Sequence, residues 1–418
     1  MSAPQSAKAL ATITSGASGA SGATPISSAS IPSSVDSPPH ASSTLRTSST
    51  SGAPNAPCPS AAFDPVSDLT TAEGLADAIG FARDELSSVR VASVESSERT
   101  SLTFLDVAYA GSAAARATLP TRLVLKQKLP GPPGAKPPRA LELDFYARIA
   151  PSLPSPPVVR CLGARAPSAM SPGFVVLEDL RATHAEPADD EIDVAPAVDA
   201  LARLHAAKWE SADRPTWPRG NPTEQSIRAA TQWIAARLPA FFDAAGNALD
   251  ASERRLYQRV FSFASSVSSA PSSASSAPTR PWLRLLDGRA QTLIHGDAHI
   301  GNCLFPRDPR GDAYLIDWDR WQADVGARDL AFMMLHWRPQ KRWQHEETLL
   351  RRYLAQLEAH GVRGYAWDDL WNDYRSCWIR NLTIPVTRQA EGRPEESWRD
   401  ALECTIAAVI DLGGEALL

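Results

Sequence analysis

The chain has 418 residues, of which 43% are hydrophobic and 21% charged, so it can bury a sizeable core and form more than one folded unit. Its formal net charge of -5 argues against a nucleic-acid partner, because proteins that bind nucleic acids present basic surfaces. The five scattered cysteines indicate neither a disulfide framework nor a zinc site, and no apolar run reaches the roughly 18 residues of a membrane span. We therefore expect a cytoplasmic protein without a membrane span.

Two segments have low complexity. Residues 1–66 are dominated by Ser, Ala, Pro, Gly and Thr. Because this segment has little apolar surface to bury, we predict a disordered tail. A transit peptide is the alternative, since the stretch before Asp36 has no acid and is rich in Ser, but such peptides are normally Arg-rich and amphipathic. The second segment, 264–279, is predicted to be a surface loop because helical patterns flank it.

Folded structure is predicted to begin with a helix near Asp68. Thr70 and Glu73 have the spacing of a capping box. Apolar residues at helical spacing follow, namely Leu75, Ile79, Ala82 and Leu86.

Strand-like segments follow the helix. They are Val89–Val94, Leu102–Tyr109, Leu123–Leu129, Val158–Leu162 and Phe174–Leu177. The turn between the first two contains no glycine. The third segment carries Lys126 and Lys128, which point to one face because side chains two apart share a side of a strand.

The second half of the chain is mostly helical in pattern. Apolar residues recur at helical spacing in Pro196–Trp209 and again around Leu349–Leu357. All twelve tryptophans lie beyond residue 200, so the aromatic material is concentrated in this half. Most of them are expected to pack in the core.

A loop with kinase-like spacing begins at Ile294-His295-Gly296-Asp297 and continues to Asn302. A short apolar strand then ends in Ile316-Asp317-Trp318-Asp319. An Asp followed five residues later by an Asn, and then by a second Asp, supplies the base and oxygen ligands that phosphoryl transfer from ATP requires. Asp297 is therefore predicted to accept the proton of the attacking hydroxyl. Asn302 and Asp317 are predicted to hold Mg²⁺, which prefers oxygen ligands.

The neighbours of this loop are given structural roles. His295 is expected to orient the loop by hydrogen bonding, and His299 is also expected to be structural. Cys303 precedes apolar residues, which indicates a small buried core residue.

The loop lacks the Arg of a protein-kinase His-Arg-Asp motif, and no Phe-Gly follows its metal Asp. His295-Gly296-Asp297 and Ile316-Asp317-Trp318-Asp319 instead resemble the aminoglycoside phosphotransferase and choline-kinase-like superfamily, including its ecdysteroid-kinase-like branch. Asp329-Leu330-Ala331 resembles the family element whose Asp supports the catalytic loop. The helix Leu201–Ala206 extends the resemblance, which covers roughly residues 67–418.

The resemblance implies an α+β, bilobal protein-kinase-like fold with a small antiparallel β-sheet lobe and a larger, mainly helical lobe. The nucleotide-binding lobe would span 67–180, and the catalytic and acceptor-binding lobe 181–418. Lys126 is predicted to anchor the phosphates of ATP, with Lys128 as the alternative. Glu142 precedes a Phe-Tyr pair, as the family's helix glutamate does, and is the expected partner of the lysine.

Two further parts of a nucleotide site follow from the resemblance. Phe174–Leu177 runs into Glu178-Asp179-Leu180, which resembles the family's hinge, so backbone groups near Leu177 and Glu178 would bind adenine. The turn Glu95–Ser101 occupies the place of the phosphate-covering loop. It has no glycine, and we expect hydroxyls such as that of Ser97 to meet the phosphates.

The acceptor is expected to be a small-molecule alcohol: an aminoglycoside, a choline-like amino alcohol or a steroid-like alcohol. A cation site could be lined by three acids that lie near Trp367 and Trp371 in the sequence, namely Asp368, Asp369 and Asp373. The pattern of these acids is explained better by alternating charges on an exposed helix face. The sequence therefore predicts an ATP- and Mg²⁺-dependent small-molecule kinase. A nucleotide-binding pseudokinase scaffold is the alternative, and a protein kinase is a weaker one.

Overall fold

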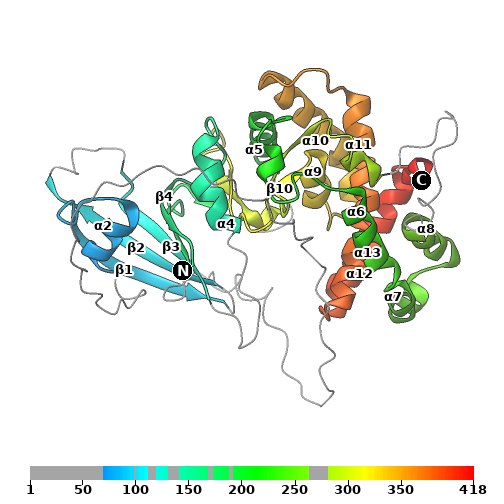
Figure 1. The fold of residues 1–418 in the computed structure, drawn as a ribbon, viewed down its shortest axis with the longest axis horizontal. Helices are drawn as coiled ribbons and strands as arrows, with labels where there is room; N and C mark the ends of the chain where they lie inside the picture. Colours follow the sequence, from blue (N-terminus) through cyan, green and yellow to red (C-terminus); the bar gives the residue numbers. More distant parts are fainter. Residues whose placement is uncertain are drawn as a thin grey trace, which may run out of the picture.

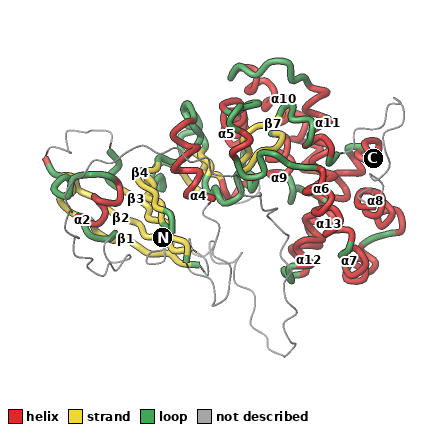
Figure 2. The backbone as a smooth tube through the Cα atoms, viewed as in Figure 1, coloured by secondary structure: helices red, strands yellow, loops and turns green. Residues whose placement is uncertain are grey.

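The structure is a computed structural model that describes residues 69–97, 100–111, 119–129, 141–167, 173–187, 192–262 and 281–418. The predicted tail and the predicted loop over 264–279 lie outside these residues. A small sheet lobe lies beside a larger helical lobe (Figure 1). The strands of the sheet gather at one end of the molecule and most helices at the other (Figure 2). The predicted α+β bilobal fold is confirmed.

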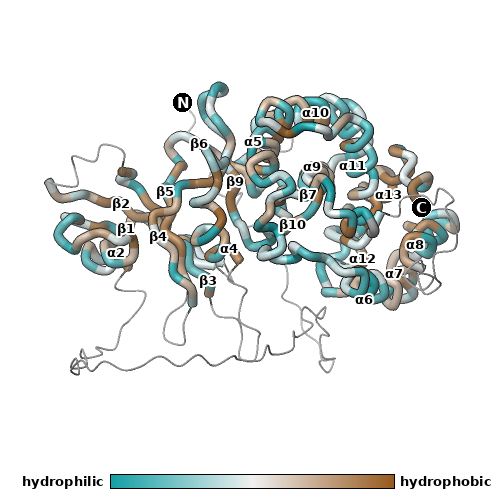
Figure 3. The backbone as a smooth tube through the Cα atoms, turned by 45° about the horizontal axis from the view of Figure 1, so that its top comes forward, coloured by the Kyte–Doolittle hydropathy of each residue, from teal (hydrophilic) through white to brown (hydrophobic). Residues whose placement is uncertain are grey.

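The small lobe is built on an antiparallel five-stranded sheet with the order β1-β2-β3-β5-β4. The strands are β1 Leu86–Ser96, β2 Thr100–Tyr109, β3 Arg122–Lys128, β4 Cys161–Arg165 and β5 Phe174–Glu178. Apolar residues alternate along β3, where Leu123 and Leu125 are buried between partly exposed neighbours. Hydrophobic colouring marks several of these strands (Figure 3).

Helix α2, Ala72–Ile79, covers the sheet. Its cap is Thr71, whose hydroxyl accepts the Gly74 N–H at 3.1 Å, so the predicted capping role of Thr70 is wrong. The helix ends at Gly80, which has φ +74°. Glycine takes this left-handed conformation without steric cost, so the helix stops early and Leu86 begins β1 instead of continuing the helical face.

The fourth predicted strand begins later than expected. Val158 forms an isolated bridge to Leu315 of the large lobe, and β4 begins only at Cys161. The Leu315 N–H also donates to the Pro157 carbonyl at 2.8 Å. The segment before β4 is therefore attached to the strand that precedes Asp317.

The large lobe contains most of the helices. They are α5 Ala195–Ala207, α6 Glu224–Ala235, α7 Leu238–Ala245, α8 Ala251–Ser262, α9 Ala327–Met333, α10 Pro339–Ala359, α11 Trp367–Asn381, α12 Thr383–Ala390 and α13 Glu395–Asp411. Its short helical turns are η3 Arg214–Thr216, η4 Gly246–Ala248, η6 Leu283–Leu285, η7 Ile300–Asn302 and η8 Gly414–Leu417, whereas η2 Ala150–Ser152 precedes β4 in the small lobe. No helix in the described ranges is long and apolar enough to cross a membrane.

Short strands support the predicted catalytic loop. The pairs are β7 Gln291–Ile294 with β10 Gln322–Val325, and β8 Cys303–Pro306 with both β6 His184–Ala185 and β9 Tyr314–Leu315. Asp297 and Asn302 thus lie in the connection between two strands, and Asp317 follows a third. The buried Cys303 confirms the prediction of a small core residue.

Candidate active site

Lys126 joins the two lobes. Its Nζ lies 2.8 Å from Glu142 Oε1 and 3.1 Å from Asp317 Oδ1. The Lys126 and Glu142 side chains are only 12% and 3% exposed. Burial lowers the pKa of Lys126, but the two carboxylates outweigh that effect and the pKa is raised. The lysine is therefore held charged between the small lobe and the strand end that carries Asp317.

The helix that carries Glu142 is fixed by aromatic stacking. It begins as α4 Leu141–Asp144 and continues directly into the π-helical turn η1 Phe145–Ile149. The Phe145 ring stacks on Trp318 with ring centroids 3.7 Å apart and planes 5° from parallel. Because Trp318 lies between the two acids of the Asp-Trp-Asp sequence, this stack positions Glu142 relative to both of them.

Asp319 is a candidate site residue that sequence reasoning missed. It binds Lys128, which also lies 3.9 Å from Glu142 Oε2. One carboxylate oxygen of Asp319 is buried without a hydrogen-bond partner in the described part of the chain. Oxygens of Glu142, Asp317 and Asp319 lie within 4.8 Å of one another, so these acids could share a cation. The signal was present, since Asp319 stands two residues after Asp317.

His295 orients the catalytic loop. Its Nδ1 lies 3.3 Å from the Asp297 N–H, which must donate to it. Its Nε2 lies 2.8 Å from the Ile316 carbonyl, an acceptor, so Nε2 must carry the proton. This neutral tautomer connects the loop to the strand end before Asp317, which is the structural role predicted for His295.

The Asn302 side chain is turned by its own loop. Its Nδ2 donates to the Asp297 carbonyl at 2.9 Å, which leaves Oδ1 as the available acceptor. The Ile316 N–H donates to the Asn302 carbonyl at 3.0 Å. Asn302 and Asp317 are therefore brought to adjoining backbone segments with oxygen atoms suited to Mg²⁺.

Asp317 has an uncommon backbone conformation. Its φ is +63°, a left-handed value that is unusual outside glycine and that Asp tolerates better than most residues. Burial raises the pKa of the carboxyl, but Lys126 and Lys128 outweigh that effect, so the pKa lies below its usual range. The Asp317 carboxylate is therefore anionic at neutral pH.

Asp329 supports the loop that carries Asp297, as the resemblance to the aminoglycoside phosphotransferase superfamily implied. Its carboxylate accepts the N–H groups of His295 at 2.7 Å and Gly296 at 2.9 Å. His205 Nε2 lies 3.2 Å from the same carboxylate, and His205 Nδ1 lies 2.8 Å from the Tyr353 hydroxyl. Asp329, His205 and Tyr353 are fully buried, so the loop rests on a closed polar network within the helical lobe.

A model of the phosphotransferase enzyme family matches residues 109–371, which is more than half of the chain and includes the loop, its support and the Lys126–Glu142 pair. The chain belongs to this family. The expectation of a small-molecule phosphotransferase is thereby confirmed. Among curated proteins, no sequence matches.

Solved structures with a similar fold include three small-molecule kinases. A macrolide 2'-phosphotransferase from Brachybacterium faecium is 18% identical, with 81% of this chain and 97% of that chain covered and a TM-score of 0.44. A spectinomycin phosphotransferase, in complex with ADP and spectinomycin, is 12% identical, with 77% and 93% covered and a TM-score of 0.43. A choline kinase from Streptococcus pneumoniae is 13% identical, with 78% and 94% covered and a TM-score of 0.40.

The described residues on either side of the predicted nucleotide loop's centre are hydrogen-bonded to each other. Ser97 Oγ accepts the Thr100 N–H at 3.1 Å and donates to the Thr100 carbonyl at 3.3 Å. The Ser97 hydroxyl is therefore engaged by the backbone of Thr100. Its role toward phosphate stays a prediction.

The hinge amides are partly engaged as well. The Glu178 N–H donates to the Arg160 carbonyl at 2.9 Å, and the Asp179 N–H donates to the Arg122 carbonyl at 3.0 Å. Leu177 is buried within β5. Adenine binding near Leu177 and Glu178 stays a prediction, and it cannot use the Glu178 N–H without breaking that hydrogen bond to Arg160.

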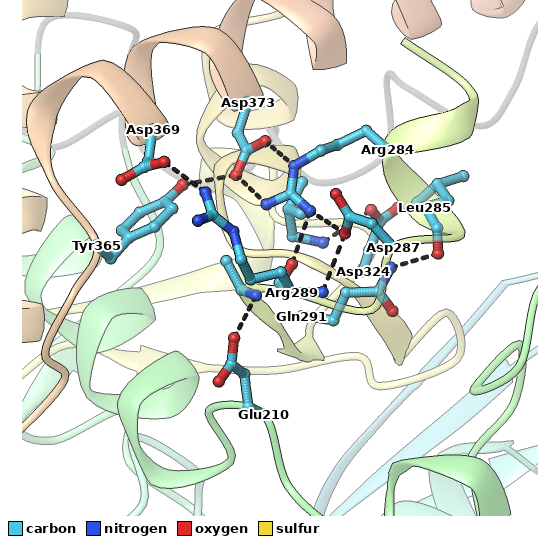
Figure 4. A network of polar contacts seen from close by, with 12 residues as sticks. Glu210, Arg284, Leu285, Asp287, Arg289, Gln291, Asp324, Tyr365, Asp369 and Asp373 are labelled. Carbon is cyan, nitrogen blue, oxygen red and sulfur yellow. Dashed lines mark hydrogen bonds and ion pairs between the residues drawn. The ribbon is translucent and has the colours of Figure 1, made fainter. Parts of the chain in front are cut away.

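Two of the three acids considered for a cation site, Asp369 and Asp373, are engaged by other side chains (Figure 4). Asp373 is buried, accepts two bonds from Arg284 at 2.7 and 3.0 Å, and accepts the Tyr365 hydroxyl at 2.9 Å. Asp369 binds Arg289 at 2.5 Å. The prediction of an exposed helix face is therefore wrong for Asp373. Both acids bind arginines of the segment before β7, so they are not available to a cation.

Proposed function

We propose that this phosphotransferase transfers the terminal phosphoryl group of ATP, with Mg²⁺, to a hydroxyl group of a small molecule. One observation carries the proposal. The fold brings both Glu142 and Asp317 into direct contact with Lys126, although Asp317 lies 191 positions further along the chain. Phosphoryl transfer needs such a combination of a phosphate anchor and metal-holding oxygens.

The residues divide the work. Lys126, kept charged by Glu142, binds the phosphates of ATP. Asp317 and the Oδ1 of Asn302 would hold Mg²⁺, with Asp319 as a third oxygen donor. The ion would supply positive charge to offset that of the phosphates.

Asp297 serves as the base for the acceptor. Its carboxylate is 27% exposed, so an incoming hydroxyl can reach it. Because Asp329 and His295 hold the loop rigid, the carboxylate can stay in place while it accepts the proton. Loss of such a base typically lowers turnover by about 10²–10⁴-fold.

In this proposal, 67–180 form the nucleotide-binding lobe and 181–418 the catalytic and acceptor-binding lobe. The acceptor is an alcohol such as an aminoglycoside, a choline-like amino alcohol or a steroid-like alcohol, and the enzyme acts in the cytoplasm. The intact set of Asp297, Asn302 and Asp317 argues against a pseudokinase scaffold, which would not need a base.

A screen of acceptors tests the proposal. Purified protein is incubated with ATP, Mg²⁺ and a panel of alcohols, and phosphorylated products are detected by mass, because ATP loss alone includes background hydrolysis. Asp297→Asn is the matched control, since it keeps the shape of the side chain. We expect a product that depends on Mg²⁺ and on Asp297. Tight Mg²⁺-dependent nucleotide binding without transfer to any acceptor or to water would favour the scaffold.

A further inference from the structure

A planar cation lies on an aromatic ring of the small sheet. The central carbon of the Arg181 guanidinium is 3.4 Å from the centroid of the Phe104 ring. Only a face-to-face arrangement of the two planar groups permits so short a distance, because an edge-on guanidinium would push its nitrogens into the ring. Arg181 comes directly after the predicted hinge, and Phe104 lies in the middle of β2.

The strand register places this stack between Lys126 and the predicted hinge. Phe104 of β2 and Leu177 of β5 both pair with Val124 of β3. Directly paired residues of neighbouring strands share a face of the sheet, and so do residues two apart in one strand, so this row lies on the same face as Lys126. A nucleotide whose phosphates meet Lys126 and whose base reaches the hinge therefore lays the base over this row.

The Phe104 ring is covered by the arginine and not by the apolar core. The ring is only 6% exposed, yet among the described residues Phe104 belongs to neither hydrophobic core cluster. The Arg181 side chain, in contrast, is 45% exposed. Since the ring covers one flat face of the guanidinium, the opposite face is left accessible to a ligand.

Asp179 fixes the orientation of this guanidinium. Its carboxylate accepts Arg181 Nε at 3.0 Å and Nη2 at 2.9 Å, and it also accepts the Arg181 backbone N–H at 3.0 Å. A second cation, Arg122 Nη2, donates to the same carboxylate at 2.9 Å, and the Asp179 side chain is buried. These hydrogen bonds occupy an edge of the guanidinium, so its flat faces remain for stacking.

The backbone of this segment has few donors to offer to the edge of a base. Three of its amides already donate within the protein, namely those of Glu178, Asp179 and Arg181. A base that binds here is therefore held chiefly through its flat ring face. Every base has such a face, and a guanidinium stacks on it favourably.

We propose that Arg181 is the platform on which the base of the nucleotide stacks, so that the base, the guanidinium and the Phe104 ring form three parallel layers. The inference rests on the proposed function and deepens it by assigning a residue outside the predicted hinge. Because the strength of stacking grows with the area of the ring, this platform favours purine over pyrimidine nucleotides.

A nucleotide and a phosphate chain without a base separate stacking from charge. Calorimetric titration in Mg²⁺ compares non-hydrolysable ATP and CTP analogues with inorganic tripolyphosphate. Arg181→Gln should weaken binding of the ATP analogue about tenfold, the loss expected for one stacking contact, and leave tripolyphosphate binding almost unchanged. The preference of the wild type for the ATP over the CTP analogue should shrink in this variant. Arg181→Lys should lose as much, because lysine keeps the charge but has no flat face.

Arg310→Gln is the matched control. Arg310 repeats the local arrangement of Arg181, because its backbone N–H and its Nε donate to Asp308, two residues earlier, at 3.0 and 3.4 Å. Its side chain is 90% exposed instead of resting on a ring, so nucleotide binding should not change. Melting temperatures show whether each variant is folded. If Arg181→Gln does not fold, Arg181→Lys gives the same comparison.

The outcomes are separable. Tighter binding of the ATP analogue in the Arg181 variants would overturn the inference, because the guanidinium would then block the base site. Unchanged binding, an equal loss for tripolyphosphate, full affinity in Arg181→Lys or an undiminished purine preference in Arg181→Gln would also overturn it. All of these results leave the kinase intact. Absence of Mg²⁺-dependent nucleotide binding in the wild type would instead overturn the proposed function, and the inference with it.

Discussion

Asp329 holds His295 through the backbone: its carboxylate accepts the His295 N–H at 2.7 Å from a helix 34 positions further along the chain. The same carboxylate accepts the Gly296 N–H at 2.9 Å. Two consecutive amides of the catalytic loop therefore share one buried anion. Any change to this carboxylate acts on the loop without touching the acceptor or the nucleotide.

We expect Asp329→Asn to destabilise the protein by about 3–5 kcal/mol, because the amide cannot accept both N–H groups and leaves buried partners unpaired. Urea unfolding at pH 7 measures the change. Asp199→Asn is the control, since its pair with Arg352 is partly exposed and should contribute under about 1 kcal/mol. Equal losses in the two variants would contradict the supporting role.

The same carboxylate predicts a pH dependence. Burial raises the pKa of Asp329, but the hydrogen bond and charge of His205 and the N–H of Gly296 outweigh that effect and lower it. A depressed pKa stabilises the folded state above the unfolded value, near about 4, and this contribution is lost as the pH falls through the folded value. The stability gap between wild type and Asp329→Asn should therefore be constant above about pH 5 and shrink below pH 4. A gap that widens in acid would show that the sign is wrong.

The two lysines of β3 should differ in function. Lys126 is bound to both Glu142 and Asp317, whereas Lys128 is bound to Asp319. Lys126→Met should raise the KM for ATP and lower kcat by about 10²-fold, as expected for loss of a preorganised phosphate contact, and Lys128→Met should do much less. Steady-state kinetics with an identified acceptor gives both values. The reverse ranking would transfer the anchoring role to Lys128.

Gly296 should tolerate no side chain. It has φ +79°, and an added Cβ would meet the Arg320 carbonyl at 2.2 Å. Gly296→Ala should therefore displace the loop and abolish most activity. Gly361→Ala is a matched control, because Gly361 also has a positive φ, +96°, but has nothing within 4 Å of the added Cβ. Backbone strain alone, about 1 kcal/mol, should appear in both variants. Similar activity in the two would exclude the close contact as the cause.

The prediction of the catalytic loop rests on local spacing. Asp297, Asn302 and Asp317 lie in a loop and at a strand end that are close in sequence, so their order can be recognised locally. That Lys126 and Lys128 share one face of β3 follows from the two-residue period of a strand. The strands and the large-lobe helices followed from apolar alternation and helical spacing for the same reason.

The remaining features depend on partners far away in the sequence. Asp373 is buried because Arg284, 89 positions earlier, reaches it. Lys128 binds Asp319 across 191 positions, so no local pattern could assign that partner. The late start of β4 also depends on a distant partner, because Val158 forms a bridge to Leu315. Tertiary contacts of this kind override local preference.

In the proposed function, Asp297 serves as the base and Asp317 as a metal ligand. Calorimetric titration with a non-hydrolysable ATP analogue, with and without Mg²⁺, tests these separate roles most directly. Asp297→Asn should bind the analogue with the same Mg²⁺ dependence as wild type while turnover falls about 10²–10⁴-fold, because only the base is lost. Asp317→Asn should lose much of the Mg²⁺ dependence itself, because an anionic ligand is replaced by a neutral amide. Loss of metal-dependent binding in Asp297→Asn together with its retention in Asp317→Asn would contradict the assignment.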